Sequence, residues 1–122
     1  RGTALRVTEM WELLGHTEGV RCCAYAAGPR RLLTASDDCT LRLWDAATGM
    51  QLTSWTAHRG FVLGCAFAPG GRTIASCSDD ETVRLWDAAG AKLCTLRKHR
   101  AAVNAVHWAD VPEPTLVSAS AD

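Results

Sequence analysis

The feature that most constrains the fold is an internal repeat with a period of about 42 residues. The segment TASDDCTLRLWDAATG (34–49) returns as SCSDDETVRLWDAAG (76–90), and the chain reaches residue 122 in a third, shorter statement, SASAD. Three histidines stand 42 and 41 residues apart: His16, His58 and His99. Three aspartates keep an interval of 42: Asp38, Asp80 and Asp122. A period of this length is typical of architectures in which each repeat is one supersecondary unit stacked on its neighbours.

Within each repeat the residue pattern predicts four short strands and no helix. Apolar runs of strand length are separated by Gly, Pro and Asp–Asp turns, and TLRLW (40–44) and TVRLW (82–86) alternate in period two. The predicted strands are 19–26, 32–36, 40–44, 50–55, 61–68, 73–78, 82–86, 91–96, 101–109 and 115–120. Because one small antiparallel sheet cannot bury both of its faces, neighbouring sheets must stack on it.

We label the strands of a repeat a to d, and the whole chain (1–122) then holds about three repeats in one domain. Its predicted parts are strands c and d of a first unit (1–14), a first repeat (15–55), a second repeat (56–97), and strands a and b of a third (98–122). Because a chain opened in this way leaves sheet edges unpaired, we expect it to belong to a longer protein or to assemble with copies of itself.

Charge and composition exclude several classes of function. Lys plus Arg number 13 and Asp plus Glu number 13, so the basic excess expected of a protein that binds nucleic acid or an anionic membrane is missing. No apolar run approaches the roughly 18 residues of a membrane helix, and no secretory signal is visible. We therefore expect no nucleic-acid or membrane partner.

The six cysteines show no C-x-x-C pair and no zinc-ligand spacing. Cys23 and Cys65 share a repeat position that Val106 fills in the third copy, which predicts a small, buried apolar side chain there. Free, buried thiols favour a reducing, intracellular compartment, and the cytoplasm is the expected location.

The residues capable of chemistry recur once per repeat. A Ser–His–Asp arrangement suggests a nucleophilic hydrolase, but no serine lies in a G-x-S-x-G elbow. A constellation that returns in every repeat serves structure rather than catalysis. We expect a buried chain of hydrogen bonds, in which a Trp indole donates to a hydroxyl, the hydroxyl to a His, and the His to an Asp. In the first copy the hydroxyl is Thr34 or Ser36, and in the second it is Ser76 or Ser78.

These motifs resemble those of the WD40 repeat family: LGH (14–16), an aromatic residue in strand a, the Asp–Asp turn and RLWD. The resemblance implies an all-β fold, a segment of a β-propeller with about three blades that are four-stranded antiparallel sheets. It also implies a structural tetrad in each repeat. The tetrads are His16, Thr34, Asp38 and Trp44, then His58, Ser76, Asp80 and Trp86, then His99, Ser118 and Asp122, with Thr8 in place of the third Trp.

The resemblance further implies binding of a peptide or protein on the face that carries the b–c turns and d–a loops, which we term the b–c face. The positions that contact partners in this family correspond to Gly19, Arg21, Asp37, Phe61, Leu63, Asp79, Ala102 and Asn104. Phe61 and Leu63 would form an exposed apolar patch beside Arg21 and two carboxylates. The alternative is that Phe61 packs between two blades.

Other signals are weaker. The Asp–Asp pairs could suggest a metal or acid–base site but fit a turn residue followed by a tetrad residue better, and RKHR (97–100) fits a solvated loop better than a nucleic-acid patch. The sequence therefore predicts a non-catalytic scaffold for protein–protein interaction, without cofactor or metal. The alternative is a structural segment that associates with copies of itself, closes a ring by sharing strands and has no ligand of its own.

Overall fold

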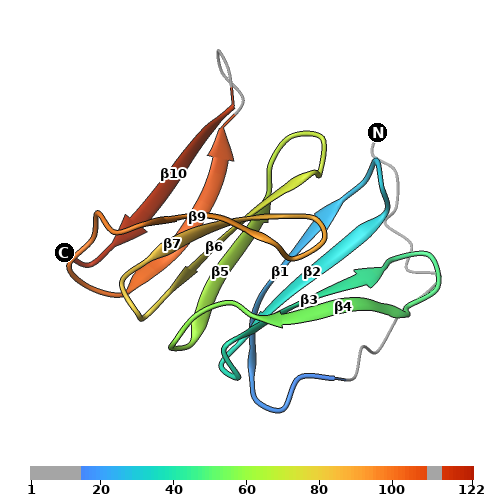
Figure 1. Ribbon diagram of the computed structural model, residues 1–122, viewed down its shortest axis with the longest axis horizontal. Coiled ribbons are helices and arrows are strands. Elements are labelled where there is room, and N and C mark those ends of the chain that lie inside the picture. The colour runs from blue at the N-terminus through green and yellow to red at the C-terminus, as the bar shows by residue number, and fades with distance from the viewer. Residues whose placement is uncertain (1–14, 110–113) are drawn as a thin grey trace, which may run out of the picture.

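The computed structural model describes residues 15–109 and 114–122, which form three antiparallel sheets (Figure 1). The first sheet has the order β1 (Val20–Ala26), β2 (Arg31–Ser36), β3 (Thr40–Asp45) and β4 (Gln51–Thr56). The second has the order β5 (Val62–Phe67), β6 (Thr73–Ser78), β7 (Val83–Asp87) and β8 (Lys92–Leu96), and the third pairs β9 (Val103–Ala109) with β10 (Thr115–Ser120).

The all-β prediction is confirmed. Each of the predicted strands from residue 19 onward is present, and its ends differ by at most two residues from the predicted ones. The strands are short, and every pairing within a sheet is antiparallel. The two strands predicted within 1–14 lie outside the described residues.

The turn between β2 and β3 has the same geometry as the turn between β6 and β7. Cys39 and Glu81 occupy equivalent positions with φ of 72° and 73°, in the left-handed region that costs a non-glycine residue about 1 kcal/mol. The Cys39 N–H donates to the Ser36 carbonyl at 3.2 Å, and the Glu81 N–H donates to the Ser78 carbonyl at 3.3 Å. This shared turn presents the Asp–Asp pair of each repeat at the same end of its sheet.

Two hydrophobic clusters join the sheets face to face. On β6, Ile74 packs into the cluster between the first and second sheets, while the next residue, Ala75, packs into the cluster between the second and third. The Trp86 ring lies 5.8 Å from the Trp55 ring of the first sheet, measured between centroids. The second sheet is thus covered on both faces, which explains why five consecutive residues of β6 are buried.

The first strands of the three sheets, β1, β5 and β9, lie next to one another, and the later strands spread outward (Figure 1). One prediction about packing is wrong in part. At the shared repeat position Cys65 and Val106 are buried, but Cys23 is exposed. The reason is that this position faces the preceding sheet, and within the described part of the chain no sheet precedes the first.

Candidate functional site

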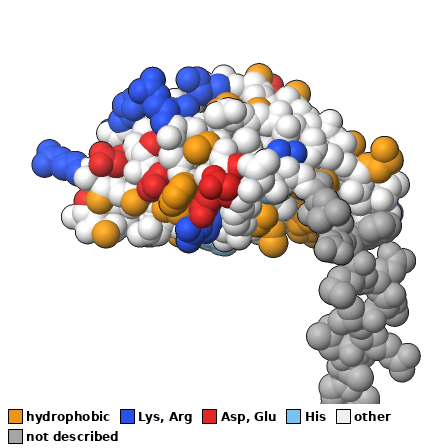
Figure 2. Space-filling model, turned by 90° about the horizontal axis from the view of Figure 1, so that it is seen from below, with side chains coloured by type: hydrophobic (Ala, Val, Ile, Leu, Met, Phe, Trp, Pro, Cys, Tyr) orange, Lys and Arg blue, Asp and Glu red, His pale blue; other side chains and the backbone are white. Residues whose placement is uncertain are grey.

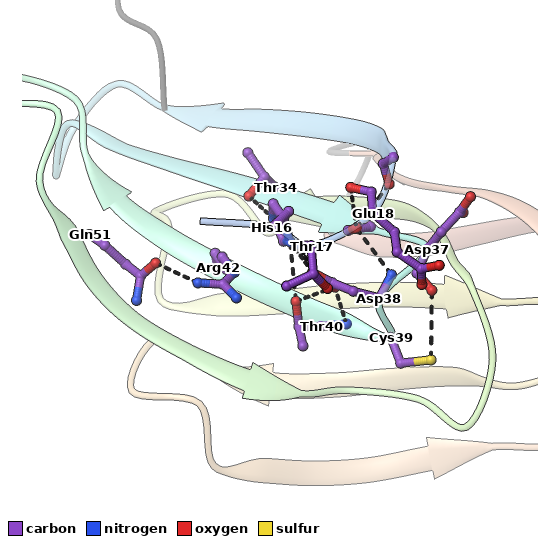
Figure 3. Close-up of polar contacts among 12 residues, drawn as sticks. His16, Thr17, Glu18, Thr34, Asp37, Asp38, Cys39, Thr40, Arg42 and Gln51 are labelled. Atoms are coloured by element: carbon purple, nitrogen blue, oxygen red, sulfur yellow. Dashed lines mark hydrogen bonds and ion pairs between the residues drawn. The ribbon is translucent and has the colours of Figure 1, made fainter. Parts of the chain in front are cut away.

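The structure links the first set of predicted tetrad residues by hydrogen bonds. Trp44 Nε1 donates to Thr34 Oγ1 at 2.9 Å, and Thr34 Oγ1 lies 2.6 Å from His16 Nε2. His16 Nδ1 lies 2.9 Å from Asp38 Oδ2. Figure 3 shows the imidazole between Thr34 on β2 and Asp38 in the β2–β3 turn, so the chain of bonds connects the sheet interior to its loop end.

The donors and acceptors fix the tautomer of His16. An ionised Asp38 only accepts, so Nδ1 of the imidazole carries the proton and donates it. Nε2 is then an acceptor, and the Thr34 hydroxyl donates to it after accepting the indole N–H of Trp44. Each of the four side chains therefore uses a hydrogen-bonding atom that would otherwise be buried without a partner.

The second copy reproduces this arrangement. Trp86 Nε1 donates to Ser76 Oγ at 2.9 Å, Ser76 Oγ lies 2.7 Å from His58 Nε2, and His58 Nδ1 lies 2.9 Å from Asp80 Oδ2. Ser76 and His58 are 0% and 2% exposed. Burial lowers the pKa of His58, which keeps the imidazole neutral near pH 7.

The third copy holds three of the four residues. His99 Nε2 lies 2.8 Å from Ser118 Oγ, and His99 Nδ1 lies 3.2 Å from both carboxylate oxygens of Asp122. The His99 side chain is 19% exposed, far more than that of His58. Thr8, which the repeat spacing places where the indole would stand, lies outside the described residues.

The sequence interpretation missed two members of these networks, Thr40 and Thr82. Each follows its aspartate by two residues, and the Thr40 and Thr82 hydroxyls donate to Oδ1 of Asp38 and Asp80 at 2.5 and 2.6 Å. The signal was present, because both copies read S-D-D-x-T. The structure also resolves the open choice of hydroxyl: Thr34 and Ser76 bind the indoles, whereas Ser36 and Ser78 accept the N–H of the aspartates in the turns.

Hydrogen bonding dominates the ionisation of the network aspartates. Burial by itself would raise the pKa of Asp80, but the Thr82 hydroxyl, the charge that His58 carries once it is protonated in acid, and the Arg59 N–H outweigh burial and lower the pKa to about 2. Burial opposes the same shift at Asp38, where bonds from Thr40, His16 and backbone N–H groups hold the pKa well below its usual range. Both aspartates are thus anionic at neutral pH and serve as acceptors.

This geometry does not suit nucleophilic catalysis. The Ser76 oxygen is fully buried and accepts the Trp86 indole, so no substrate carbonyl can approach it. In the described part of the chain, no group of three or more His, Cys, Asp or Glu side chains could hold a metal ion.

On the b–c face the structure brings together three of the predicted contact residues. The Arg21 guanidinium donates to both carboxylate oxygens of Asp37, from Nε at 2.6 Å and from Nη2 at 2.9 Å. Its central carbon lies 5.7 Å from the centre of the Phe61 ring, a cation–π contact between the first and second sheets. Phe61 nevertheless remains 42% exposed, so its ring contacts Arg21 of the first sheet and is still open to solvent.

The remaining predicted contact residues lie at or directly before the starts of β1, β5 and β9 and in the β6–β7 turn. Asp79 and Asn104 are exposed, Leu63 and Ala102 are half-buried, and Gly19 is exposed at the start of β1. The Asp37 carboxylate raises the pKa of Arg21 through hydrogen bonds and charge, and the field of Asp79 acts in the same direction. Asp79 therefore lies within electrostatic range of the Arg21–Asp37 pair.

Figure 2 looks at the molecule from below Figure 1, onto the b–c face. Acidic and hydrophobic side chains lie side by side on this face, while Lys and Arg side chains gather along one side of it. The opposite end of the sheets carries a hollow of about 460 Å³, lined by the repeat-equivalent aromatic residues Tyr25, Phe67 and Trp108. The b–c face differs from that end in that its exposed aromatic ring, Phe61, contacts an arginine that is itself held by a carboxylate.

Known proteins share this repeat in sequence and in structure. The WD40 family, described as WD domain, G-beta repeat, matches residues 7–45 and 49–87, which is more than half of the chain. The chain is 42% identical over 52 residues to guanine nucleotide-binding protein G(I)/G(S)/G(T) subunit beta-1 of Homarus americanus, and to the same extent to guanine nucleotide-binding protein subunit beta-1 of Caenorhabditis briggsae. These matches cover 43% of this chain and 15% of each relative.

The solved structure of U3-55K is similar over 76% of this chain, with a TM-score of 0.72 and 31% sequence identity. The match covers 29% of the U3-55K chain. Each of these matches thus covers less than a third of the relative's own length. The described residues contain no helix long and apolar enough to cross a membrane.

Proposed function

Because this chain belongs to the WD40 family, we propose that it is a non-catalytic scaffold for protein–protein interaction and binds a peptide or protein segment on its b–c face. The observation that carries the proposal is the Arg21–Asp37–Phe61 cluster. It holds an aromatic side chain 42% exposed in a fixed position at the junction of two sheets, where exposed aromatic and Arg side chains commonly anchor a partner.

Rigidity supports the proposal. The Asp37 carboxylate fixes the guanidinium through two parallel hydrogen bonds, and the guanidinium in turn covers one side of the Phe61 ring. An anchor that is already ordered loses little conformational entropy when a partner binds, so more of the contact energy appears as affinity. The buried tetrads stiffen the turns that carry Asp37 and Asp79, and they have no accessible nucleophile to offer a substrate.

The cellular compartment is part of the same proposal. All six cysteines are free thiols, and Cys65 and Cys77 are buried in the clusters between the sheets. Free thiols in a protein core are characteristic of proteins that reside in a reducing environment. We therefore expect the scaffold to act inside the cell.

Selection of peptides from a random display library on the immobilised chain tests the proposal. Selected peptides are synthesised and their affinities measured by fluorescence anisotropy against the wild type and against Phe61→Ala. Loss of the aromatic anchor is expected to weaken binding by about tenfold or more. Met50→Ala is the matched control, because Met50 is an exposed hydrophobic residue in the turn before β4, at the opposite end of the sheets.

Two results would overturn the proposal. If selection yields no sequence above background, the chain is not a peptide-binding scaffold. If Met50→Ala weakens binding while Phe61→Ala does not, binding occurs at the other end and the b–c face is wrong. Circular dichroism on both variants checks that each substitution leaves the sheets intact.

Self-association by strand sharing stays a prediction. Among the described residues, β9 and β10 form a two-stranded sheet, and Val117 on β10 is 51% exposed where its equivalent in the first sheet, Leu33, is buried. Light scattering over a range of concentrations tests it. A discrete multiple of 13.1 kDa that persists on dilution supports a closed ring, and a monomer at all concentrations excludes it.

A further inference from the structure

We propose that Asp79, together with Phe61 and Leu63, forms a binding site for an arginine side chain of the partner peptide. This inference rests on the proposed function, since it names the chemistry of the segment that the b–c face would bind. The first and second repeats of this chain have the same backbone conformation around the Asp–Asp turn but carry different side chains there.

The two turns are equivalent at the backbone. The Asp37 N–H donates to the Gly19 carbonyl at 2.9 Å, and the Asp79 N–H donates to the Phe61 carbonyl at 3.2 Å. In both repeats the aspartate directly precedes the tetrad aspartate in the turn with the left-handed residue. The two carboxylates therefore leave the main chain at the same place on the b–c face.

The two repeats differ in the residue that stands at the position of Arg21. In the first repeat the position five residues after the histidine is Arg21, which neutralises Asp37 by two hydrogen bonds. In the second repeat the same position is Leu63, which cannot pair with a carboxylate. Among the described residues Asp79 makes no ion pair, and its one side-chain hydrogen bond comes from Ser78 Oγ at 3.5 Å.

The surroundings of Asp79 favour a cation with an apolar stem. The exposed Phe61 ring and the half-buried Leu63 lie on the same repeat, and Arg21, the cation of the cluster, is already held by Asp37. The group of Arg21, Asp37 and Asp79 thus carries one uncompensated negative charge. A phosphate backbone or an anionic lipid surface would be repelled there, whereas a basic peptide side chain would be attracted.

Arginine fits this site better than lysine. Its planar guanidinium can donate two parallel hydrogen bonds to one carboxylate and can lie against an aromatic ring at the same time. The first repeat shows this combination within the chain, because Arg21 binds Asp37 and lies 5.7 Å from the Phe61 ring centre. The intramolecular pair is a template for the contact that the second repeat leaves open to a partner.

The test uses a two-by-two comparison on the full chain. A peptide selected on the wild type is synthesised with arginine and with citrulline, its neutral isostere, and each is titrated against the wild type and Asp79→Asn. We expect the wild type to prefer arginine over citrulline by about threefold to tenfold, and Asp79→Asn to bind both peptides equally. Glu81→Gln is the control, because it removes the same charge from an exposed residue of the same turn and should keep the preference.

A second variant tests the template directly. Leu63→Arg installs in the second repeat the residue found in the first, so the new guanidinium should pair with Asp79 and lower the affinity of the arginine peptide by a similar factor. An arginine preference unchanged in Asp79→Asn, or selected peptides without enrichment of arginine, would overturn this inference and leave the scaffold proposal standing. A selection without any binding peptide would overturn both.

Discussion

Replacing Ser76 by alanine isolates the energetic role of the buried hydrogen-bond chain. The hydroxyl of Ser76 is 0% exposed and serves two buried partners, the indole N–H of Trp86 at 2.9 Å and Nε2 of His58 at 2.7 Å. Ser76→Ala leaves a donor and an acceptor without partners. Each such group costs about 1–3 kcal/mol, and because the loss of one oxygen allows some relaxation, we expect a total of about 3 kcal/mol.

The chain contains its own control for this substitution. Ser118 holds the equivalent position but has one partner in the network, His99, whose side chain is 19% exposed and can bond water instead. Ser118→Ala should therefore cost about 0.5–1 kcal/mol. Ser76→Thr should restore most of the stability, because Thr34 fills the same position in the first repeat with its methyl group accommodated.

Equilibrium unfolding in urea, followed by tryptophan fluorescence at pH 7, gives the measurement. With a slope of about 1.5 kcal/mol per molar urea, Ser76→Ala should lower the unfolding midpoint by about 2 M and Ser118→Ala by less than about 0.7 M. Equal losses for both variants, with unchanged slopes, would refute the reasoning, since the indole–hydroxyl–imidazole chain would then contribute nothing beyond a single solvated bond. Failure of Ser76→Thr to recover stability would mean that shape, not the hydroxyl, matters at this position.

Three further outcomes follow from the same contacts. The pKa values of His58 and Asp80 are both lower in the folded chain, so the unfolded chain binds more protons in acid. The free energy of unfolding should therefore fall as the pH drops from about 6.5 to 2. Urea midpoints that do not change with pH would contradict this. Thr82→Val removes a donor to Asp80 and should move acid unfolding to higher pH, measured by circular dichroism during an acid titration, while an unchanged midpoint would show that the threonine is dispensable. Gly60→Ala places a Cβ against Asp79 Oδ1, so it should displace that flexible carboxylate, change stability by less than about 0.5 kcal/mol, and weaken the arginine peptide in the anisotropy assay.

The positions of the strands were predictable, because the middle sheet is covered on both faces and its strands therefore need apolar residues. Ile74 and Ala75 point to opposite neighbours, so β6 had to be apolar at successive positions, and the flanking Gly and Asp–Asp turns set its ends. The exposure of Cys23 was not predictable, because burial at that position depends on which sheets lie beside it. A comparison of repeats treats all copies as equivalent, whereas stacking gives each copy different neighbours.

Most residues of the hydrogen-bond networks were predictable from the sequence, but which atoms bond to each other was not. The sequence left Thr34 and Ser36 as alternatives, and the three-dimensional structure was needed to assign Thr34 to the indole and Ser36 to the turn. The family resemblance predicted Phe61 beside Arg21, but the sequence pattern alone does not predict the contact between the ring and the guanidinium. It crosses from one sheet to the next, so its existence depends on the angle between sheets, which no short-range pattern encodes.

Positions at which the two repeats carry the same residue type serve the fold, and positions at which they differ can serve recognition of a partner. Tetrad positions keep the same chemistry in both, because each buried donor needs its acceptor whatever the chain binds. The position after the histidine that holds Arg21 in one repeat and Leu63 in the other changes from a cation to an alkyl group on the same backbone frame. Such a change leaves the sheet intact and alters the charge that the b–c face presents, so partner selectivity can vary from repeat to repeat without a cost to the fold. The clearest example is Asp79, whose carboxylate makes no ion pair with any described residue and whose repeat holds Leu63 at the position of Arg21.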